Sequence, residues 1–269
     1  MARMRSSWRE VYVLLALDAG NTNIKIGAFE KGKLIWDARL RTVHEQTADE
    51  FGVLMRNLFQ LAGLDSARVE AMIIASVVPP IDASLALMAQ RYFKTEPVFV
   101  THATDTGLRL CYDDPREVGA DRLVDAAAAF RKYGGPCIVV DLGTAITFNA
   151  VSANAEYLGG IIAAGIGISI DALFARTARL PRVDFREPEK LIGTNTVGSI
   201  QSGLYYGALG MIDGVIERLV GALGPNTKVI ATGGQAQLIA RSSRYLKVID
   251  EHLTLEGLEM IWSRGRERR

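Results

Sequence analysis

Two short segments of the chain place an acidic residue, a glycine and hydroxyl or amide side chains directly after an apolar run. The first is Asp18-Ala19-Gly20-Asn21-Thr22-Asn23, which follows Val11–Leu17, and the second is Asp141-Leu142-Gly143-Thr144, which follows Cys137–Val140. A glycine in a tight turn leaves backbone N–H groups open to an anion, and threonine and asparagine add further donors. This chemistry suits the binding of phosphate groups.

The charged residues of these turns extend that chemistry to cations. A carboxylate repels phosphate, but Asp18 can face a magnesium ion through its bound waters, because Mg²⁺ prefers carboxylates plus water. Lys25, which follows Ile24 just after the first turn, supplies a positive point charge. For a single segment of this kind, an ordinary hairpin turn is the better explanation. Two copies, each after an apolar strand, favour a duplicated nucleotide-binding unit.

A repeated order of strands and helices must position the two turns. Apolar alternation and helical spacing in the first half predict strands at Val11–Leu17, Ile24–Phe29, Lys33–Arg41, Val69–Val77 and Pro97–Val100, with helices at 47–63, Ile81–Phe93 and Asp121–Tyr133. Strands that alternate with helices after an initial meander predict an α/β domain.

The second half is expected to repeat this order. Its predicted strands are Pro136–Val151, which holds two of them, Gly159–Gly165, Lys228–Ala231 and Leu246–Ile249, and its predicted helices are Ile168–Ala178, Thr196–Val220 and Leu255–Trp262. The turn Gly134-Gly135-Pro136 looks like the hinge between the halves. We therefore expect domains at 11–133 and 134–262, with disordered tails at 1–10 and 263–269.

The segment Gly119-Ala120-Asp121-Arg122 opens a predicted helix and carries a second kind of chemistry. Asp121 can be a general base, and Arg122 can bind an anionic substrate group through two hydrogen bonds. Tyr112, a few residues upstream, can form a wall of the same pocket. An aspartate at this position also suits an ordinary helix cap, so the sequence leaves both roles open.

Two further segments combine polar residues with glycine. Asn195 and Thr196 precede the long predicted helix, where either can cap the helix or contact a substrate. Thr232-Gly233-Gly234 follows a predicted strand and suits close approach of the backbone to a nucleobase or ribose, although a plain strand-to-helix turn explains it almost as well.

Composition excludes several classes of function. With 31 Lys and Arg against 30 Asp and Glu, the net charge of +1 gives no general field for nucleic acid or a membrane surface. The cysteines Cys111 and Cys137 and the scattered histidines indicate neither a disulfide framework nor a zinc site. The apolar run Val11–Leu17 is too short for a signal peptide or a membrane span. We expect a cytoplasmic protein that binds no nucleic acid and no membrane.

Taken together, these motifs resemble the type III pantothenate kinases, within the superfamily of acetate and sugar kinases, Hsp70 and actin. The resemblance runs in order from about residue 12 to about residue 262, and only the leader Met1–Glu10 departs from the family pattern. The residues that carry it are Asp18–Lys25, Tyr112, Pro115, Gly119–Arg122, Asp141–Ala145, Asn195 and Thr196.

The resemblance implies a fold and a reaction. The fold would be two ribonuclease-H-like domains of the actin-like ATPase type, related by duplication, with ATP in the cleft between them. The reaction would be the ATP-dependent phosphorylation of pantothenate at its primary hydroxyl to 4'-phosphopantothenate, the first step of coenzyme A biosynthesis.

The resemblance also implies roles for individual residues. Asp121 would accept the proton, and Asp18–Lys25 with Thr144 would bind ATP. Pantothenate would be bound by Tyr112, Gly119, Ala120, Asp121, Arg122 and Thr196. Asp141 would bind a monovalent cation, K⁺ or NH₄⁺, and Mg²⁺ would accompany ATP. The family is homodimeric, so Thr196 would act across the interface.

Two alternatives remain open from the sequence. One is a kinase of the same superfamily that phosphorylates a sugar or a carboxylate, and a panel of acceptors separates it from a pantothenate kinase. The other is a regulatory protein that binds ATP without turnover.

Overall fold

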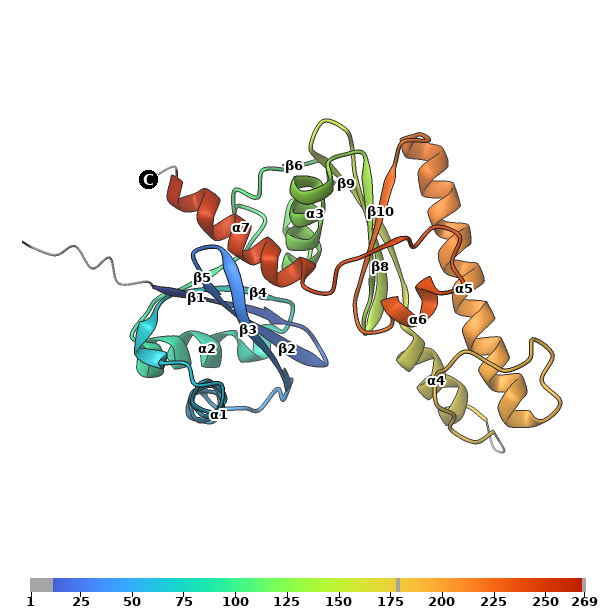
Figure 1. Ribbon diagram of the computed structural model, residues 1–269, viewed down its shortest axis with the longest axis horizontal. Coiled ribbons are helices and arrows are strands. Elements are labelled where there is room, and N and C mark those ends of the chain that lie inside the picture. Colours follow the sequence, from blue (N-terminus) through green and yellow to red (C-terminus); the bar gives the residue numbers. More distant parts are fainter. Residues whose placement is uncertain (1–11, 178–179, 268–269) are drawn as a thin grey trace, which may run out of the picture. The chain divides into compact units, whose positions relative to one another are not determined.

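The computed structural model describes residues 12–177 and 180–267 of the chain and divides into two compact units (Figure 1). Unit 1 comprises the residues up to Val100 and from Leu258 onward, and unit 2 comprises Thr101–Gly257. Each unit contains one mixed β-sheet with helices packed on it. The predicted tail at 1–10 lies outside the described residues.

Unit 1 is built on a five-stranded sheet in the order β3-β2-β1-β4-β5. An antiparallel meander joins β1 (Val13–Ala19), β2 (Asn23–Glu30) and β3 (Lys33–Arg41), and β4 (Val69–Ser76) and β5 (Pro97–Phe99) run parallel to β1 on its other side. Central strands are covered on both faces and therefore read as continuous apolar runs. Accordingly, β1 is buried along its whole length, whereas the edge strand β3 alternates between exposed and half-buried residues.

The helices between residues 48 and 93 pack on one face of this sheet, as Figure 1 shows. They are α1 (Ala48–Leu61), the 3₁₀ turn η1 (Ser66–Arg68), α2 (Pro79–Met88) and the π-helical continuation η2 (Ala89–Phe93). Phe51, Met55 and Phe59 of α1 lie in the same apolar core as Leu15 and Leu17 of β1. This core holds β1 rigidly up to the residue where the first turn begins.

Unit 2 repeats the topology of unit 1. Its six-stranded sheet has the order β11-β10-β7-β8-β9-β6. The meander consists of β7 (Cys137–Leu142), β8 (Ala145–Val151) and β9 (Glu156–Ala164), and β10 (Lys228–Thr232) and β11 (Val248–Ile249) run parallel to β7. The short strand β6 (Arg109–Leu110) adds to the outer edge of β9. The predicted α/β fold of two duplicated domains is confirmed, because a meander followed by two parallel strands occurs twice.

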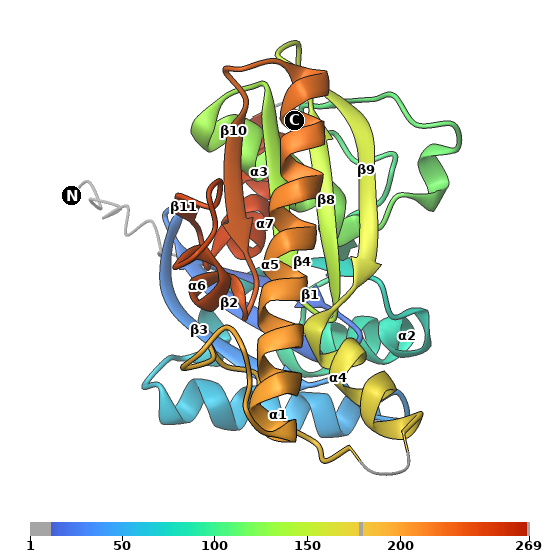
Figure 2. The ribbon, with the colours of Figure 1, turned by 90° about the vertical axis from the view of Figure 1, so that its right-hand side faces the viewer.

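Helices cover both faces of the unit 2 sheet (Figures 1 and 2). On one face α3 (Ala120–Tyr133), which follows the 3₁₀ turn η3 (Pro115–Glu117), contacts β7 and β8. On the other face lies α5 (Thr196–Leu223), whose Ile212 and Ile216 share a core with Ile138 and Val140 of β7. The remaining helices are α4 (Ile166–Ala175), α6 (Ala236–Ala240) and α7 (Leu253–Glu267), which begins in unit 2 and continues into unit 1 from Leu258.

The division into units differs from the predicted domains in two places. The predicted boundary after Tyr133 falls inside unit 2, because α3 packs on the strands that follow it. The predicted tail from residue 263 continues α7 as far as Glu267, and the Arg266 guanidinium lies 4.6 Å from the ring centre of Tyr12. Residues 268 and 269 lie outside the described part of the chain.

Candidate active site

The first glycine turn joins β1 to β2 in unit 1. The Gly20 N–H donates to the Asn23 carbonyl at 3.0 Å, and the Thr42 hydroxyl donates to the Gly20 carbonyl at 2.6 Å. The side chains between them, Asn21 and Thr22, are exposed, as is Asn23. The turn is therefore fixed at its base, while amide and hydroxyl groups lie at its surface, as phosphate binding requires.

Lys25 and Asp18 form an ion pair behind this turn. They are direct partners in the antiparallel register of β1 and β2, and Lys25 Nζ lies 3.1 Å from Asp18 Oδ2. Asp18 is only 6% exposed, whereas the Lys25 side chain remains partly accessible. The pair places a positive charge at the base of the turn and holds the buried carboxylate in one orientation.

The second glycine turn joins β7 to β8 in unit 2 and differs from the first in one respect. Its Gly143 N–H donates to the Ala145 carbonyl at 3.1 Å, and Thr144 is exposed at its tip. In the antiparallel register of β7 and β8, Asp141 pairs with Thr147. The corresponding pair in unit 1 is Asp18 with Lys25. The register partner of the aspartate is therefore a lysine in the first turn and a threonine in the second.

Two glycines bring other loops of unit 2 against this second turn. A Cβ built on Gly165, the residue before α4, would lie 2.0 Å from the Thr144 carbonyl oxygen. A Cβ on Gly233, which follows β10, would lie 2.3 Å from Asp141 Oδ1 and 2.7 Å from the Leu142 backbone. Such contacts exclude any side chain, so Gly165 and Gly233 serve close packing within unit 2.

A matched pair of glycine substitutions tests this packing. Gly233→Ala is expected to lower the free energy of unfolding by about 1–3 kcal/mol or more, because Gly233 combines a φ of +94° with the clash against Asp141. Gly234→Ala is expected to stay within about 0.5 kcal/mol, because nothing lies within 4 Å of its Cβ position. Urea unfolding of both variants measures the difference, and equal stabilities would contradict the packing.

The donors around Asp141 fit a cation with oxygen ligands. Thr232 stands opposite Asp141 in the parallel register of β10 and β7, so their side chains lie on one face of the sheet. Thr232 is fully buried, and its hydroxyl has no hydrogen-bond partner among the described residues. A hydroxyl beside a carboxylate suits K⁺ or Mg²⁺ better than a transition metal. In residues 12–177 and 180–267, no cluster of three or more His, Cys, Asp or Glu side chains could hold a metal by itself.

Asp121 lies in the first turn of α3 in unit 2. Its Oδ1 accepts a hydrogen bond from the Arg122 N–H at 2.7 Å, and the side chain is partly exposed. Gly119 is the N-cap residue of α3, and Ala120 is 7% exposed. Asp121 therefore keeps one oxygen near the helix terminus and can present a carboxylate to a ligand.

Arg122 points from the same helix into a buried polar group on the sheet. Its Nε donates to Asn149 Oδ1 at 2.7 Å, and its guanidinium lies 6.0 Å from the ring centre of Tyr157. Tyr112 completes the group, since its ring centre is 6.3 Å from that of Tyr157 and its edge lies 3.2 Å from the Cβ position of Gly159. The predicted residues Tyr112 and Arg122 thus both lie beside Tyr157 of β9, and Arg122 also bonds to Asn149 of β8.

The surroundings of Tyr157 shift the pKa of its phenol. Burial, with smaller contributions from the nearby Tyr112 and Asp121, raises the pKa of Tyr157 to about 12, and Arg122 opposes this shift. The phenol therefore stays protonated at neutral pH and acts as a hydrogen-bond donor. Tyr157 and Asn149 were not predicted from the sequence. The glycine pair Gly159–Gly160 inside a strand was a signal for close approach of other groups.

Thr196 stands apart from the group around Arg122. It is the first residue of α5, it is exposed, and the neighbouring Asn195 caps the helix by accepting from the Gly198 N–H at 2.8 Å. Within unit 2, α3 and α5 cover opposite faces of the sheet in both views (Figures 1 and 2). The described residues therefore do not place Thr196 beside Asp121 in one chain.

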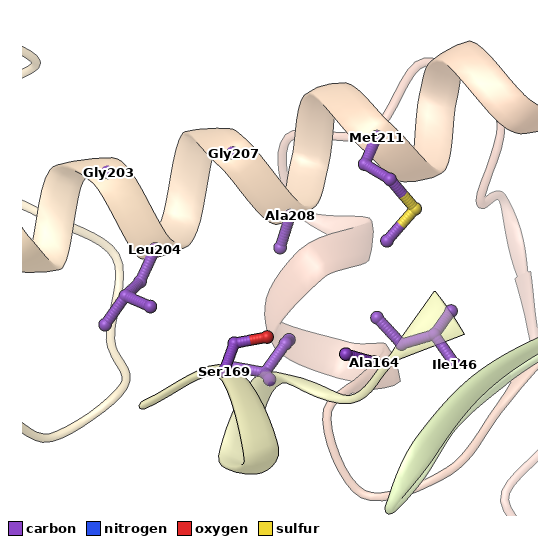
Figure 3. A pocket seen from close by; sticks show the side chains of 9 residues that line it. Ile146, Ala164, Ser169, Gly203, Leu204, Gly207, Ala208 and Met211 are labelled. Atoms are coloured by element: carbon purple, nitrogen blue, oxygen red, sulfur yellow. The ribbon is translucent and has the colours of Figure 1, made fainter. Parts of the chain in front are cut away.

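A cavity of about 240 Å³ in unit 2 is lined by residues other than the predicted site residues (Figure 3). It opens between α4, α5 and the ends of β8 and β9. Its lining residues are Ile146, Ala164, Ile166, Ser169, Gly203, Leu204, Gly207, Ala208 and Met211. The Ser169 hydroxyl already donates to the Gly165 carbonyl at 3.0 Å. This apolar lining offers nothing for phosphate or carboxylate chemistry.

Solved structures of known proteins share the fold at low sequence identity. A Baf family transcriptional activator from Campylobacter jejuni has a TM-score of 0.57 at 18% identity, with 94% of this chain and 99% of that chain covered. A 2-dehydro-3-deoxygalactonokinase from Sinorhizobium meliloti has a TM-score of 0.55 at 14% identity, with 92% and 97% covered. At these identities the likeness shows the fold alone.

Sequence comparisons identify the family. A family model for type III pantothenate kinase matches residues 14–218. The type III pantothenate kinase of Solibacter usitatus (strain Ellin6076) is 67% identical over 253 residues, which cover 94% of this chain and 97% of the relative. That of Koribacter versatilis (strain Ellin345) is 54% identical over 263 residues, which cover 94% and 96%. The chain therefore belongs to the type III pantothenate kinase family.

Proposed function

We propose that Asp121 is the proton acceptor in the reaction of this pantothenate kinase, the ATP-dependent phosphorylation of pantothenate in coenzyme A biosynthesis. The observation that carries the proposal is the position of its carboxylate. Asp121 is partly exposed at the start of α3, and the next residue, Arg122, points into the buried group with Tyr112. A base and an anion-binding group thus come from consecutive residues of one helix.

Phosphoryl transfer needs positioning and charge neutralisation more than covalent help. Asp121, within hydrogen-bonding distance of the primary hydroxyl of pantothenate, accepts its proton as the bond to phosphorus forms. Arg122 binds the carboxylate of pantothenate, and Tyr112 forms a wall of its site. Gly119 and Ala120 line the approach to Asp121 at the helix terminus.

The glycine turns supply the contacts to ATP in this proposal. In unit 1, the backbone and side chains of Asp18–Asn23 with Ile24 contact the phosphates, and Lys25 offsets their charge. In unit 2, Thr144 contacts ATP from the tip of its turn. When bound, Mg²⁺ neutralises charge on the β- and γ-phosphates, and Asp18 would hold it through its waters. Asp141 with Thr232 would hold a monovalent cation, K⁺ or NH₄⁺.

A coupled assay of ADP release tests the substrate and the cation together. Purified protein with ATP and Mg²⁺ is measured with and without pantothenate, in K⁺ and again in Na⁺. We expect turnover that requires pantothenate and is faster in K⁺. Equal rates in both salts would remove the cation role of Asp141. No pantothenate-dependent turnover would favour a different acceptor, and a panel of sugars and carboxylates would then identify it.

We further propose that the protein is a homodimer formed through unit 2. Exposed apolar side chains occur on β9, on α4 and in the first turn of α5, and α4 contacts α5. Large areas of exposed apolar surface mark protein interfaces. The exposed members are Ile161, Ile162, Ile168, Leu173, Phe174 and Val197. Thr196 precedes Val197 directly, so a second copy on this surface would cover Thr196 and let it act in the partner's site.

Phe174→Asp is expected to turn the dimer into a monomer and to raise the KM for pantothenate, because it places a charge in this apolar surface. Phe174 is 48% exposed, so the change should leave the fold intact. Light scattering after size exclusion measures the mass. The control is Leu61→Asp in unit 1, at a leucine that is 85% exposed, and it should remain dimeric. A monomeric wild-type protein would contradict the proposal.

A further inference from the structure

We infer that Asn149 is a positioning residue for the reaction, because its side-chain carbonyl fixes the Arg122 guanidinium in the orientation that binds substrate. The inference rests on the proposed function, since it takes Arg122 to contact pantothenate. No motif of the sequence points to Asn149, which lies in the middle of β8. The argument comes from the contacts that it makes inside unit 2.

Asn149 is fully buried and joins two other buried polar side chains. Its Oδ1 accepts from Arg122 Nε at 2.7 Å and from the Tyr157 hydroxyl at 3.0 Å. Its Nδ2 faces the Thr147 hydroxyl oxygen at 3.5 Å. Because Arg122 Nε can only donate, the oxygen of the Asn149 amide must face it, and the orientation of the amide is determined.

The Tyr157 hydroxyl contributes a second hydrogen bond to this arrangement at neutral pH. Tyr157 is 0% exposed, and its ring lies beside the Arg122 guanidinium. Since the phenol is protonated at neutral pH, it donates to Asn149 and does not form an ion pair with Arg122. The guanidinium therefore keeps its full positive charge for another anion.

One end of the guanidinium remains for a ligand. The guanidinium group is planar and rigid, so the hydrogen bond from Arg122 Nε to Asn149 fixes the orientation of its plane. Arg122 Nη2 is buried and has no hydrogen-bond partner among the residues that the structure describes. Gly160 lies beside it, with a Cβ position 3.0 Å from Nη2. A buried donor without a partner is costly, and a bound carboxylate would satisfy it.

The test is a double-mutant cycle in the full-length protein. Asn149→Ala, Arg122→Ala and the double variant are compared with the wild type in the ADP-release assay, with pantothenate and ATP varied separately. Asn154→Ala, at an exposed asparagine in the turn after β8, is the matched control. Tyr157→Phe is a second variant that keeps the ring, and circular dichroism checks the fold of each protein.

We expect Asn149→Ala to raise the KM for pantothenate at least ~10-fold, with little change in the KM for ATP, since misplacing a binding group by about 1 Å can cost that much. Tyr157→Phe should shift the same KM less. In the Arg122→Ala background, Asn149→Ala should have almost no further effect, because residues that act through one another are not additive.

Other outcomes overturn the inference in distinguishable ways. An equal loss from Asn149→Ala in both backgrounds would show a purely structural role. A large effect of Arg122→Ala with none from Asn149→Ala or Tyr157→Phe would overturn the positioning role and leave the proposed function intact. No effect from any of these variants would overturn both the positioning role of Asn149 and the binding of pantothenate by Arg122. If Asn149→Ala fails to fold, Tyr157→Phe replaces it in the cycle, and its effect on the KM for pantothenate is compared in the wild-type and Arg122→Ala backgrounds.

Discussion

Asp121→Asn is expected to lower kcat at least ~10²-fold, the lower range for losing a general base, with the fold and the affinity for ATP unchanged. Asparagine has nearly the shape of aspartate, and its side-chain oxygen can still accept from the Arg122 N–H, as Asp121 Oδ1 does at 2.7 Å. The substitution therefore removes the base and keeps the contact at the helix terminus. Steady-state ADP release and thermal unfolding measure the two properties.

This variant also separates the two roles that the sequence leaves open for Asp121. If Asp121 only caps α3, Asp121→Asn should keep both the stability and kcat, because asparagine caps a helix about as well as aspartate does, whereas loss of a base should lower kcat at unchanged stability. Asp37→Asn, at an exposed aspartate on β3, serves as the control for the change of charge. Turnover of Asp121→Asn at the wild-type rate would remove Asp121 from the role of base.

Lys25→Met is expected to lower kcat/KM for ATP by roughly 10²-fold or more, the usual cost of removing one donor that stabilises developing charge. Methionine keeps the apolar stem of the side chain and removes the ammonium group, which lies 3.1 Å from Asp18 and beside the first glycine turn. In the second turn Thr147 stands at the corresponding register position, so it offers no replacement for this charge.

The control for this prediction is Lys33→Met, at an exposed lysine on the edge strand β3. It changes the net charge by the same amount and should leave kcat/KM within about twofold of the wild type, since surface charges are screened in salt. Equal effects of Lys25→Met and Lys33→Met would mean that Lys25 acts only through the overall charge of the protein.

Local patterns in the sequence were sufficient to predict most strands. β3 occupies the predicted range Lys33–Arg41, because alternation of polar and apolar residues has a fixed period of two. The start of α5 at Thr196 and the end of α3 at Tyr133 were also predicted, because cap residues and the glycine at 134 mark them. Short elements such as β6 and α6 were missed, because each has too few residues for a period to appear.

The positions of the two glycine turns could be predicted, but their surroundings could not. Each turn is recognised from consecutive residues, an aspartate followed by a glycine and by hydroxyl or amide side chains. Asn149 and Tyr157 are ordinary strand residues whose importance arises only when β8 and β9 place them against Arg122 on α3. The division between the units depends in the same way on which strands α3 contacts, and that is a long-range property of the fold.

No helix in the described ranges is long and apolar enough to cross a lipid bilayer.

The most direct test of the central proposal is a calorimetric titration with pantothenate that separates binding from catalysis. The wild type, Asp121→Asn and Arg122→Ala are titrated in the presence of a non-hydrolysable ATP analogue, Mg²⁺ and K⁺. We expect Asp121→Asn to bind pantothenate within about threefold of the wild type and Arg122→Ala to bind at least ~10-fold more weakly, since hydrogen bonds to a charged group carry that much affinity. Wild-type affinity in Arg122→Ala would contradict the assignment of this part of unit 2 as the pantothenate site.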